Sequence, residues 1–243
     1  MEDDGFTLVT KRKSNKSKYT KTPSGKHIRA DGNLEDIENA MQQANRNIRD
    51  SGICDWLLKR IQMPRKVFVM GNGHFDGIHE PGAHQLAMSI ELASRSNAEI
   101  IFQDPVCTIF ENKWLESKAI EIRTDLDAKI RCDESTLFVI IHGQHEILNE
   151  FFEFNFEHNL LNNATIIGNN YKSCNWELTQ NKADFQFIDR FFNSAMITPI
   201  DCGFSTTSSS TSFKFEFASG VIVFVLGVSV VGNVEIGVEV VEG

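Results

Sequence analysis

The feature that most constrains the fold of this chain is a series of short apolar runs that alternate with helical patterns. The runs are rich in Val, Ile and Phe, and they are too short for buried helices. They lie at residues 66–70, 99–102, 120–122, 136–141 and 164–169. Strands that are apolar throughout and alternate with helices are typical of βαβ units around a parallel sheet. Because such crossovers are right-handed, we predict a Rossmann-like, doubly wound α/β fold with a mainly parallel five-stranded sheet and flanking helices.

The composition along the chain divides it into four segments. Residues 1–33 are predicted to be a disordered basic arm, because they are polar and rich in charge. Residues 34–64 read as a helical lead-in, with Asn33 as a cap before an apolar face that repeats at helical spacing. The α/β domain is expected over 65–200, and residues 201–243 are a Ser/Thr linker and a Val/Gly-rich tail.

Charge is unevenly divided between the arm and the rest of the chain. Residues 11–29 hold eight basic residues and no acidic one, whereas the whole chain has a net charge of −9. A duplex-DNA-binding protein needs a positive face that neutralises phosphates. We therefore make no strong case for nucleic acid as a partner. The basic run is either a solvated tail or a nuclear-localisation or phosphate-contacting patch.

Two further features bear on the compartment. The five cysteines are widely spaced without a Cys-x-x-Cys motif, and the N-terminus has no apolar signal-peptide core. Both predict free thiols in a reducing, intracellular compartment. Residues 217–234 are 18 residues without a charge, a marginal length for a membrane span. Their glycines and polar residues, and the alternation that follows, favour an added β-hairpin or a poorly packed tail over a membrane helix.

Ligands of doubly wound sheets bind at the carboxyl ends of the strands, which directs attention to the turn Gly71-Asn72-Gly73 after the first strand. Glycines at 71, 73 and 77 have the spacing GxGxxxG rather than the dinucleotide spacing GxGxxG. Such glycines let the backbone approach a phosphate or a ribose. The alternative is that they serve only the turn from strand to helix.

Three other strand ends complete a tentative ligand-binding set. Asp104 ends the second strand, where an acidic residue can hold ribose hydroxyls or simply begin a helix. His142 follows the fourth strand, at a position suited to a ligand or to a structural hydrogen bond, and Asn169 ends the fifth. We assign no catalytic residue, because no GxSxG or comparable set is present. No histidine or cysteine spacing indicates a metal site.

Several segments, in order, resemble the Sensitivity to Red Light Reduced (SRR-like) family. They are Asp4-Gly5-Phe6-Thr7-Leu8-Val9 (family DGWTVV), Val69-Met70-Gly71-Asn72-Gly73 (YGLGxF), Gln85-Leu86-Ala87 (QLA), Asp104-Pro105-Val106 (YDPVF), Thr136-Leu137-Phe138 with His142-Gly143 (TLFFMPHC) and Ile167-Gly168-Asn169-Asn170-Tyr171 (IGNSF). The match covers roughly residues 65–172 and the arm. The family's Pro-His-Cys-Gly is here Ile141-His142-Gly143-Gln144, so only the histidine carries over.

The resemblance implies a regulatory protein of the cytoplasm and nucleus that acts with protein partners in circadian-clock input, in the regulation of haem biosynthesis, or in both. It implies no known reaction, and we favour a role that is not enzymatic. The alternative from the residues themselves is an enzyme or sensor that binds a nucleotide or adenosyl-methionine at the strand ends. The cofactor stays open between haem and these two ligands.

Overall fold

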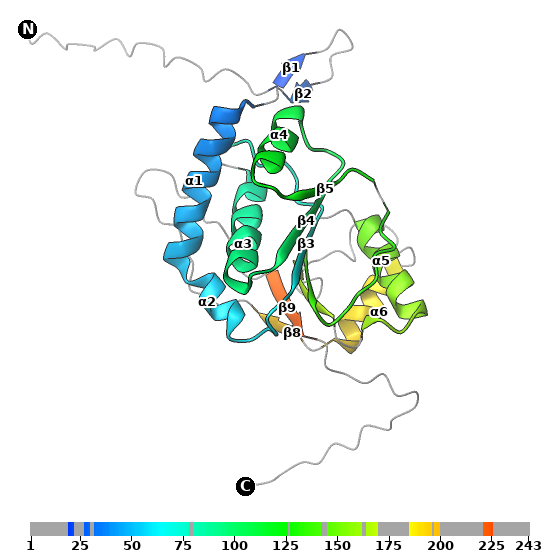
Figure 1. Ribbon diagram of the computed structural model, residues 1–243. Coiled ribbons are helices and arrows are strands. Elements are labelled where there is room, and N and C mark those ends of the chain that lie inside the picture. Colours follow the sequence, from blue (N-terminus) through cyan, green and yellow to red (C-terminus); the bar gives the residue numbers. More distant parts are fainter. Residues whose placement is uncertain are drawn as a thin grey trace, which may run out of the picture.

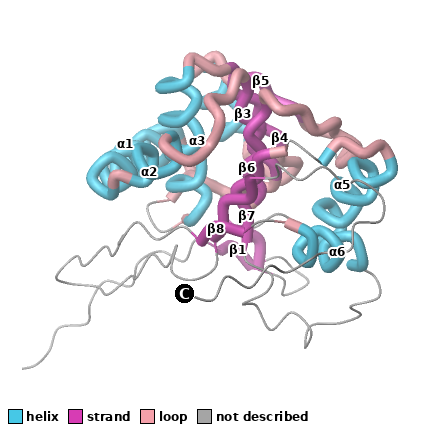
Figure 2. The backbone as a smooth tube through the Cα atoms, turned by 90° about the horizontal axis from the view of Figure 1, so that it is seen from below, coloured by secondary structure: helices cyan, strands magenta, loops and turns pink. Residues whose placement is uncertain are grey.

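A mixed sheet lies at the centre of the computed structural model, between two layers of helices (Figures 1 and 2). The structure describes residues 19–21, 27–29, 32–77, 80–125, 127–141, 145–161, 164–169, 185–195, 197–199 and 221–225. The main sheet has the order β5-β4-β3-β6-β7-β9-β8. Its strands are β3 (Lys66–Met70), β4 (Glu99–Gln103), β5 (Glu121–Arg123), β6 (Thr136–Ile140), β7 (Thr165–Asn169), β8 (Ile197–Pro199) and β9 (Val221–Val225).

The five strands from β3 to β7 are parallel to one another, which confirms the predicted α/β fold. Both faces of the central strands are covered, and this explains why runs such as Val67–Met70 in β3 and Leu137–Ile140 in β6 are continuously apolar. In β3, Val67 and Val69 belong to one hydrophobic core, and Phe68 and Met70 belong to the other. Two separate apolar layers are therefore built from alternate residues of the same strand.

Helices close the two faces of the sheet. On one side lie α1 (Leu34–Ser51), α2 (Ile53–Leu58), α3 (Pro81–Ser96) and α4 (Ile109–Ser117). On the other side lie α5 (His145–Glu157) and α6 (Gln186–Ser194) (Figure 2). No helix within the described parts of the chain is long and apolar enough to cross a membrane.

Helix α1 begins at the cap that its sequence predicts. The Asn33 side chain accepts hydrogen bonds from the N–H groups of Glu35 and Asp36, and the Asp36 side chain accepts one from the Asn33 N–H. Such a capping arrangement contributes about 1 kcal/mol. The helix ends at Gly52, whose φ of 66° lies in the left-handed region that glycine adopts most readily.

Two segments near the ends of the chain contain strands besides the five parallel ones. Within the arm that is predicted to be disordered, β1 (Tyr19–Lys21) and β2 (His27–Arg29) pair antiparallel, and the other residues up to 31 lie outside the described residues. Tyr, Thr and Ile favour strands, and the sequence Pro-Ser-Gly between them is typical of a turn. In the Val-rich segment, β9 pairs antiparallel with β7 and with β8, in agreement with the strand interpretation of that segment. The rest of residues 201–243 lies outside the described residues.

Candidate functional site

The strand order places a topological switch point at β3, because β4 follows on one side of it and β6 on the other. In open α/β sheets, ligands bind outside the carboxyl ends of the strands at such a point. Two described loops lie there: the glycine turn, residues 71–77 after β3, and the Asp104 loop, residues 104–108 after β4. We call these two loops together the carboxyl edge (Figure 1).

Glycines in the glycine turn and at the start of α3 are required for two different reasons. Gly71 and Gly73 have φ values of 64° and 72°, which side chains rarely adopt. Gly82, in the first turn of α3, has no room for a Cβ because the backbone oxygen of His74 occupies that space. The buried Asn72 side chain donates to the carbonyl oxygens of Gly73 and Gly82, at 3.0 and 3.2 Å. The turn is thereby packed directly onto the helix that follows it.

Asp104 closes the glycine turn from the neighbouring strand. Its Oδ2 accepts a hydrogen bond from the backbone N–H of Gly73 at 2.7 Å, and its Oδ1 accepts one from Val106 at 2.9 Å. The residue is only 4% exposed. One backbone donor of the glycine turn, which could otherwise bind a phosphate, is therefore already bonded to a carboxylate.

Glu111 supports both loops from inside α4. It is fully buried, and its Oε1 accepts from the Phe75 N–H at 2.7 Å. Its Oε2 accepts from the Thr108 N–H at 2.8 Å and lies 3.1 Å from Nδ1 of His74. Burial alone would raise the pKa of Glu111. The hydrogen bonds from His74, Thr108 and Phe75 outweigh burial, so the pKa is below its usual value and the group is a carboxylate.

Asp76 and Phe75 anchor the far end of the glycine turn. Oδ2 of the buried Asp76 accepts from the N–H of Gly32 at 2.8 Å, which ties the residues before α1 to this edge. The ring of Phe75 is fully buried and makes edge contacts with Phe102 and Trp114, with centroids 6.0 and 5.7 Å away. The edge is thus braced by buried acidic groups and by an aromatic cluster.

His74 keeps one side of its ring available. A carboxylate can only accept, so the hydrogen between Nδ1 of His74 and Glu111 belongs to the histidine. In the neutral ring Nε2 is then an acceptor, and 28% of the side chain is exposed. Within the described parts of the chain, no group of three or more His, Cys, Asp or Glu residues is arranged to hold a metal ion.

The structure brings four of the six sequence-predicted ligand residues into one place. Gly71, Asn72, Gly73 and Asp104 lie together at the carboxyl edge. His142 lies outside the described residues, and Asn169 ends β7, with β6 between that strand and β3. The role of these residues in binding a ligand stays a prediction.

Sequence reasoning missed the contributions of Asp76 and Glu111. For Glu111 a signal was present, because Thr108 and Glu111 have the spacing of a capping box, and the structure contains that box. The pairing of Asp76 with Gly32 joins residues 44 positions apart and leaves no such local pattern.

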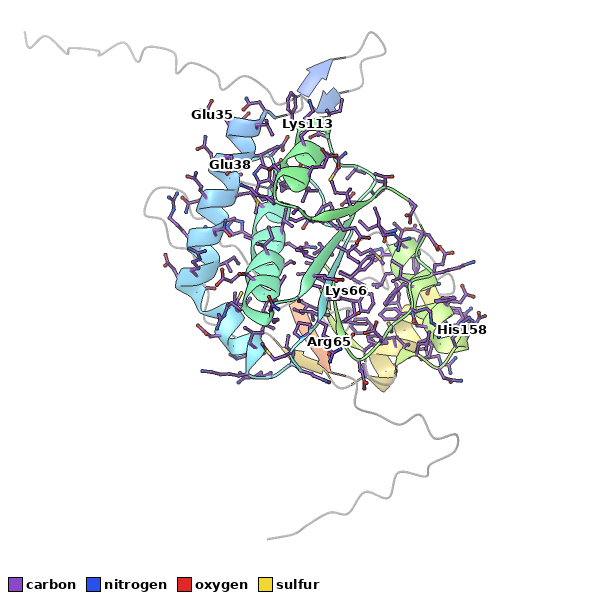
Figure 3. All side chains as sticks on the ribbon, in the orientation of Figure 1. Glu35, Glu38, Arg65, Lys66, Lys113 and His158 are labelled. Atoms are coloured by element: carbon purple, nitrogen blue, oxygen red, sulfur yellow. The ribbon has the colours of Figure 1, made fainter. Side chains whose placement is uncertain are left out.

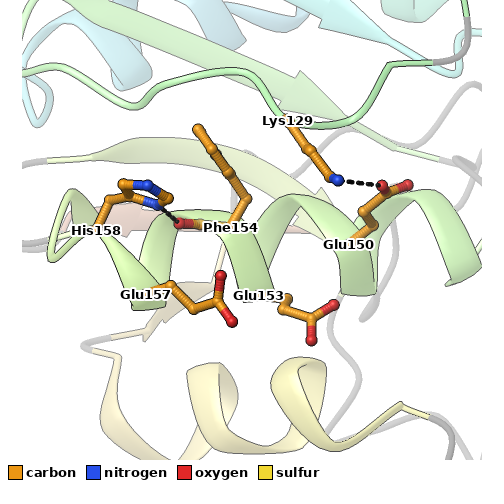
Figure 4. A pocket seen from close by; sticks show the side chains of 6 residues that line it. All are labelled: Lys129, Glu150, Glu153, Phe154, Glu157 and His158. Carbon is orange, nitrogen blue, oxygen red and sulfur yellow. Dashed lines mark hydrogen bonds and ion pairs between the residues drawn. The ribbon is translucent and has the colours of Figure 1, made fainter.

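A concave region lies along α5 (Figure 4). It is a surface pocket of about 440 Å³, lined by Lys129, Glu150, Glu153, Phe154, Glu157 and His158. Lys129 lies 3.8 Å from Glu150, and Nδ1 of His158 lies 2.7 Å from the carbonyl oxygen of Phe154. None of the predicted ligand residues lines this pocket.

Comparison with family models decides the relationship that the sequence motifs indicate. The model of the SRR1 domain matches residues 37–219. The chain belongs to the SRR1 domain family. The SRR1 match begins inside α1 and includes the whole carboxyl edge, whereas β9 follows directly after its end. No match was found among curated proteins.

Proposed function

We propose that this SRR1-domain chain is a regulatory protein rather than a nucleotide-dependent enzyme, and that it acts in circadian-clock input, in the regulation of haem biosynthesis, or in both. It works through protein partners in the cytoplasm and nucleus. The observation that carries the proposal against an enzyme is the hydrogen bond between Asp104 and the Gly73 N–H, which occupies one of the turn's backbone donors for a phosphate. The pathway rests on the family relationship.

Charge adds to this argument. Asp76, Asp104 and Glu111 are all buried at the carboxyl edge, with exposures of 4%, 4% and 0%. Within a protein, like charges repel more strongly than in water, because the surroundings are less polarisable. A phosphate placed at this edge would meet carboxylates where dinucleotide-binding proteins offer free N–H groups. The edge therefore favours a scaffold role over phosphate binding.

The competing hypothesis is an enzyme or sensor that binds a nucleotide or adenosyl-methionine. A thermal-shift assay on the full chain with ATP, NAD and adenosyl-methionine separates the two. A ligand that binds the native state raises stability by about 2.7 kcal/mol at 100 times its dissociation constant. We expect no shift with ATP or NAD. A shift with either, together with turnover of that compound, would establish the enzyme and sink the regulatory proposal.

The proposed pathway makes haem a candidate cofactor. Among the described histidines, His74 best fits the role of an iron ligand. Its Nδ1 is held by Glu111, which leaves Nε2 for a metal, an arrangement common among ligating histidines. His84, by contrast, is 3% exposed and its Nε2 pairs with Asn47. If haem binds here, His74→Ala abolishes the change in the haem absorption spectrum, whereas His158→Ala, at an exposed site, preserves it.

The regulatory role itself is tested in cells whose own copy of the gene is deleted. The readouts are the rhythm of a clock-driven reporter and the cellular haem content. We expect deletion to change at least one readout and the wild-type chain to restore it. Glu111→Ala should fail to restore it, and Glu121→Ala, which removes an exposed carboxylate on β5, should succeed. If neither readout responds to deletion, the proposed pathway is wrong.

A further inference from the structure

Exposed apolar side chains gather at the carboxyl edge. Five large apolar residues are exposed in the described parts of the chain, and four of them belong to the starts of α1 and α4 and the loop before α4. These four, which we call the apolar rim, are Leu34 (44% exposed), Val106 (49%), Ile109 (69%) and Phe110 (37%). The fifth is Met63, which lies after α2.

Hydrogen bonds between α1 and α4 bring the rim residues together. Nε1 of Trp114 donates to Glu38 at 2.9 Å, which fixes how the two helices lie against each other. Leu34 and Phe110 each precede one of these two residues by four positions, which is one helical turn. Both helices begin at the carboxyl edge, so Leu34 and Phe110 lie at the same end of the pair. Figures 1 and 3 show the starts of α1 and α4 side by side there.

Buried carboxylates hold the loop that carries Val106 and the start of α4, where Ile109 lies. Asp104 bonds to the Val106 N–H, and Glu111 forms a reciprocal capping box with Thr108. A surface that is already ordered loses little conformational entropy when it binds. The protein thus uses buried carboxylates to present apolar side chains to solvent, an arrangement typical of an interaction surface.

A specific occupant is indicated by where the segment before α1 joins the structure. Gly32 bonds to Asp76 at the carboxyl edge, two residues before Leu34, so the segment enters at the rim. Residues 1–18 are polar except for Met1 and the group Phe6-Thr7-Leu8-Val9. Tyr19 of β1 pairs with Arg29 of β2, three residues before Gly32. The nine residues between Val9 and Tyr19 reach about 30 Å when fully extended, which is ample for return to the rim.

Charge favours the same occupant. The residues that follow Val9 are strongly basic, and residues 11–18 contain five lysines and arginines and no acidic residue. The first turn of α1, next to the rim, carries the exposed carboxylates Glu35 and Asp36. An apolar group that docks on the rim therefore brings a basic run beside the carboxylates at the start of α1.

We propose that Phe6–Val9 docks intramolecularly on the apolar rim of the same chain. The segment acts as a built-in cover, and a partner that binds the rim must displace it. A tether of this kind gives an effective concentration on the order of 1 mM, so a contact with a separate-peptide dissociation constant of about 0.1 mM is about 90% closed. The inference goes beyond the proposed function and does not depend on which pathway the protein serves.

Hydrogen exchange measured by mass spectrometry on the full chain tests this inference. We expect the amides of residues 7–10 to exchange about ten-fold more slowly than in a synthetic peptide of residues 1–14, because docking is about 90% complete. Phe6→Ser and Ile109→Ser should each restore the peptide rate. Ile109 is 69% exposed at the first position of α4, so serine there leaves the fold intact.

Met63→Ser is the matched control, because Met63 is 52% exposed but lies outside the rim. This variant should keep the slow exchange. Equal rates in the wild type and the peptide would overturn the proposal, and so would slow exchange that survives Ile109→Ser. Slow exchange that disappears on dilution would also overturn it, since the occupant would then be the arm of a second copy.

Discussion

Oδ2 of Asp104 lies 2.7 Å from the backbone nitrogen of Gly73, so the end of β4 closes the turn that follows β3. The same carboxylate accepts from Val106 through its other oxygen. One side chain therefore holds two loops of the carboxyl edge, and its removal leaves two backbone N–H groups without their acceptor.

The first prediction concerns this closure. Asp104→Ala should lower the free energy of unfolding by about 2–4 kcal/mol, because each unmatched and partly buried donor costs about 1–2 kcal/mol. The measurement is urea unfolding, read as a lower midpoint at constant slope. Asp127→Ala is the control, because Asp127 also accepts a backbone hydrogen bond, from Lys129, but is exposed. A loss no greater than that of the control would show that Asp104 does not hold the edge.

The second prediction concerns the loss of folding stability at acidic pH. The pKa of Glu111 is below its usual 4.5 in the folded protein, so the folded state binds this proton less readily than the unfolded chain. Its contribution is present above pH 4.5 and is lost as the pH falls below that value. Glu111→Gln should flatten the dependence of the unfolding midpoint on pH in this range. A slope that is unchanged in the variant would contradict the assignment.

The third prediction concerns His84 in α3, which affects stability at a higher pH than Glu111 does. Burial lowers the pKa of His84 from 6.5 to about 4, so the unfolded chain takes up the proton first as the pH falls. Stability should therefore drop between pH 6.5 and 4, by roughly 3 kcal/mol in total. His84→Gln should remove this slope, whereas His158→Gln, at an exposed position, should retain it. If both variants keep the slope, another group is responsible.

The fourth prediction opposes helix propensity to packing. Gly82 lies in the first turn of α3, and alanine is normally favoured over glycine within helices by about 1 kcal/mol. Here the added Cβ would meet the backbone oxygen of His74, which cannot move without shifting the glycine turn. We therefore expect Gly82→Ala to destabilise the protein by about 1–3 kcal/mol, in line with overpacked sites. A rise in the thermal midpoint would mean that the turn is looser than the structure shows.

The sequence predicts elements better than it predicts contacts. The run at 67–70 is apolar at every position because both faces of β3 are covered, and the cap at Asn33 is visible because all its partners are local. The hydrogen bond between Gly73 and Asp104 joins residues 31 positions apart, so no local sequence pattern predicts it. Asp104 was placed correctly at a strand end, but only the fold shows that its oxygens already have backbone partners.

The pairing of β9 is a second contact that the sequence does not predict. The alternation near residue 234 and the uncharged run before it indicate strand character, but they do not name a neighbour. The neighbour of Val221–Val225 is β7, in an antiparallel register that runs from Thr165 opposite Val225 to Asn169 opposite Val221. Such long-range pairing depends on which strand edge is left open once the parallel strands have formed.

This pairing has a practical consequence for anyone who shortens the chain. Cutting at residue 200, where the composition changes, or at 219, where the family match ends, removes β9. One whole side of β7 would then present its N–H and C=O groups to water, as a ready template for another molecule. Since β9 covers this side of β7, expression work should begin with protein that extends beyond residue 225.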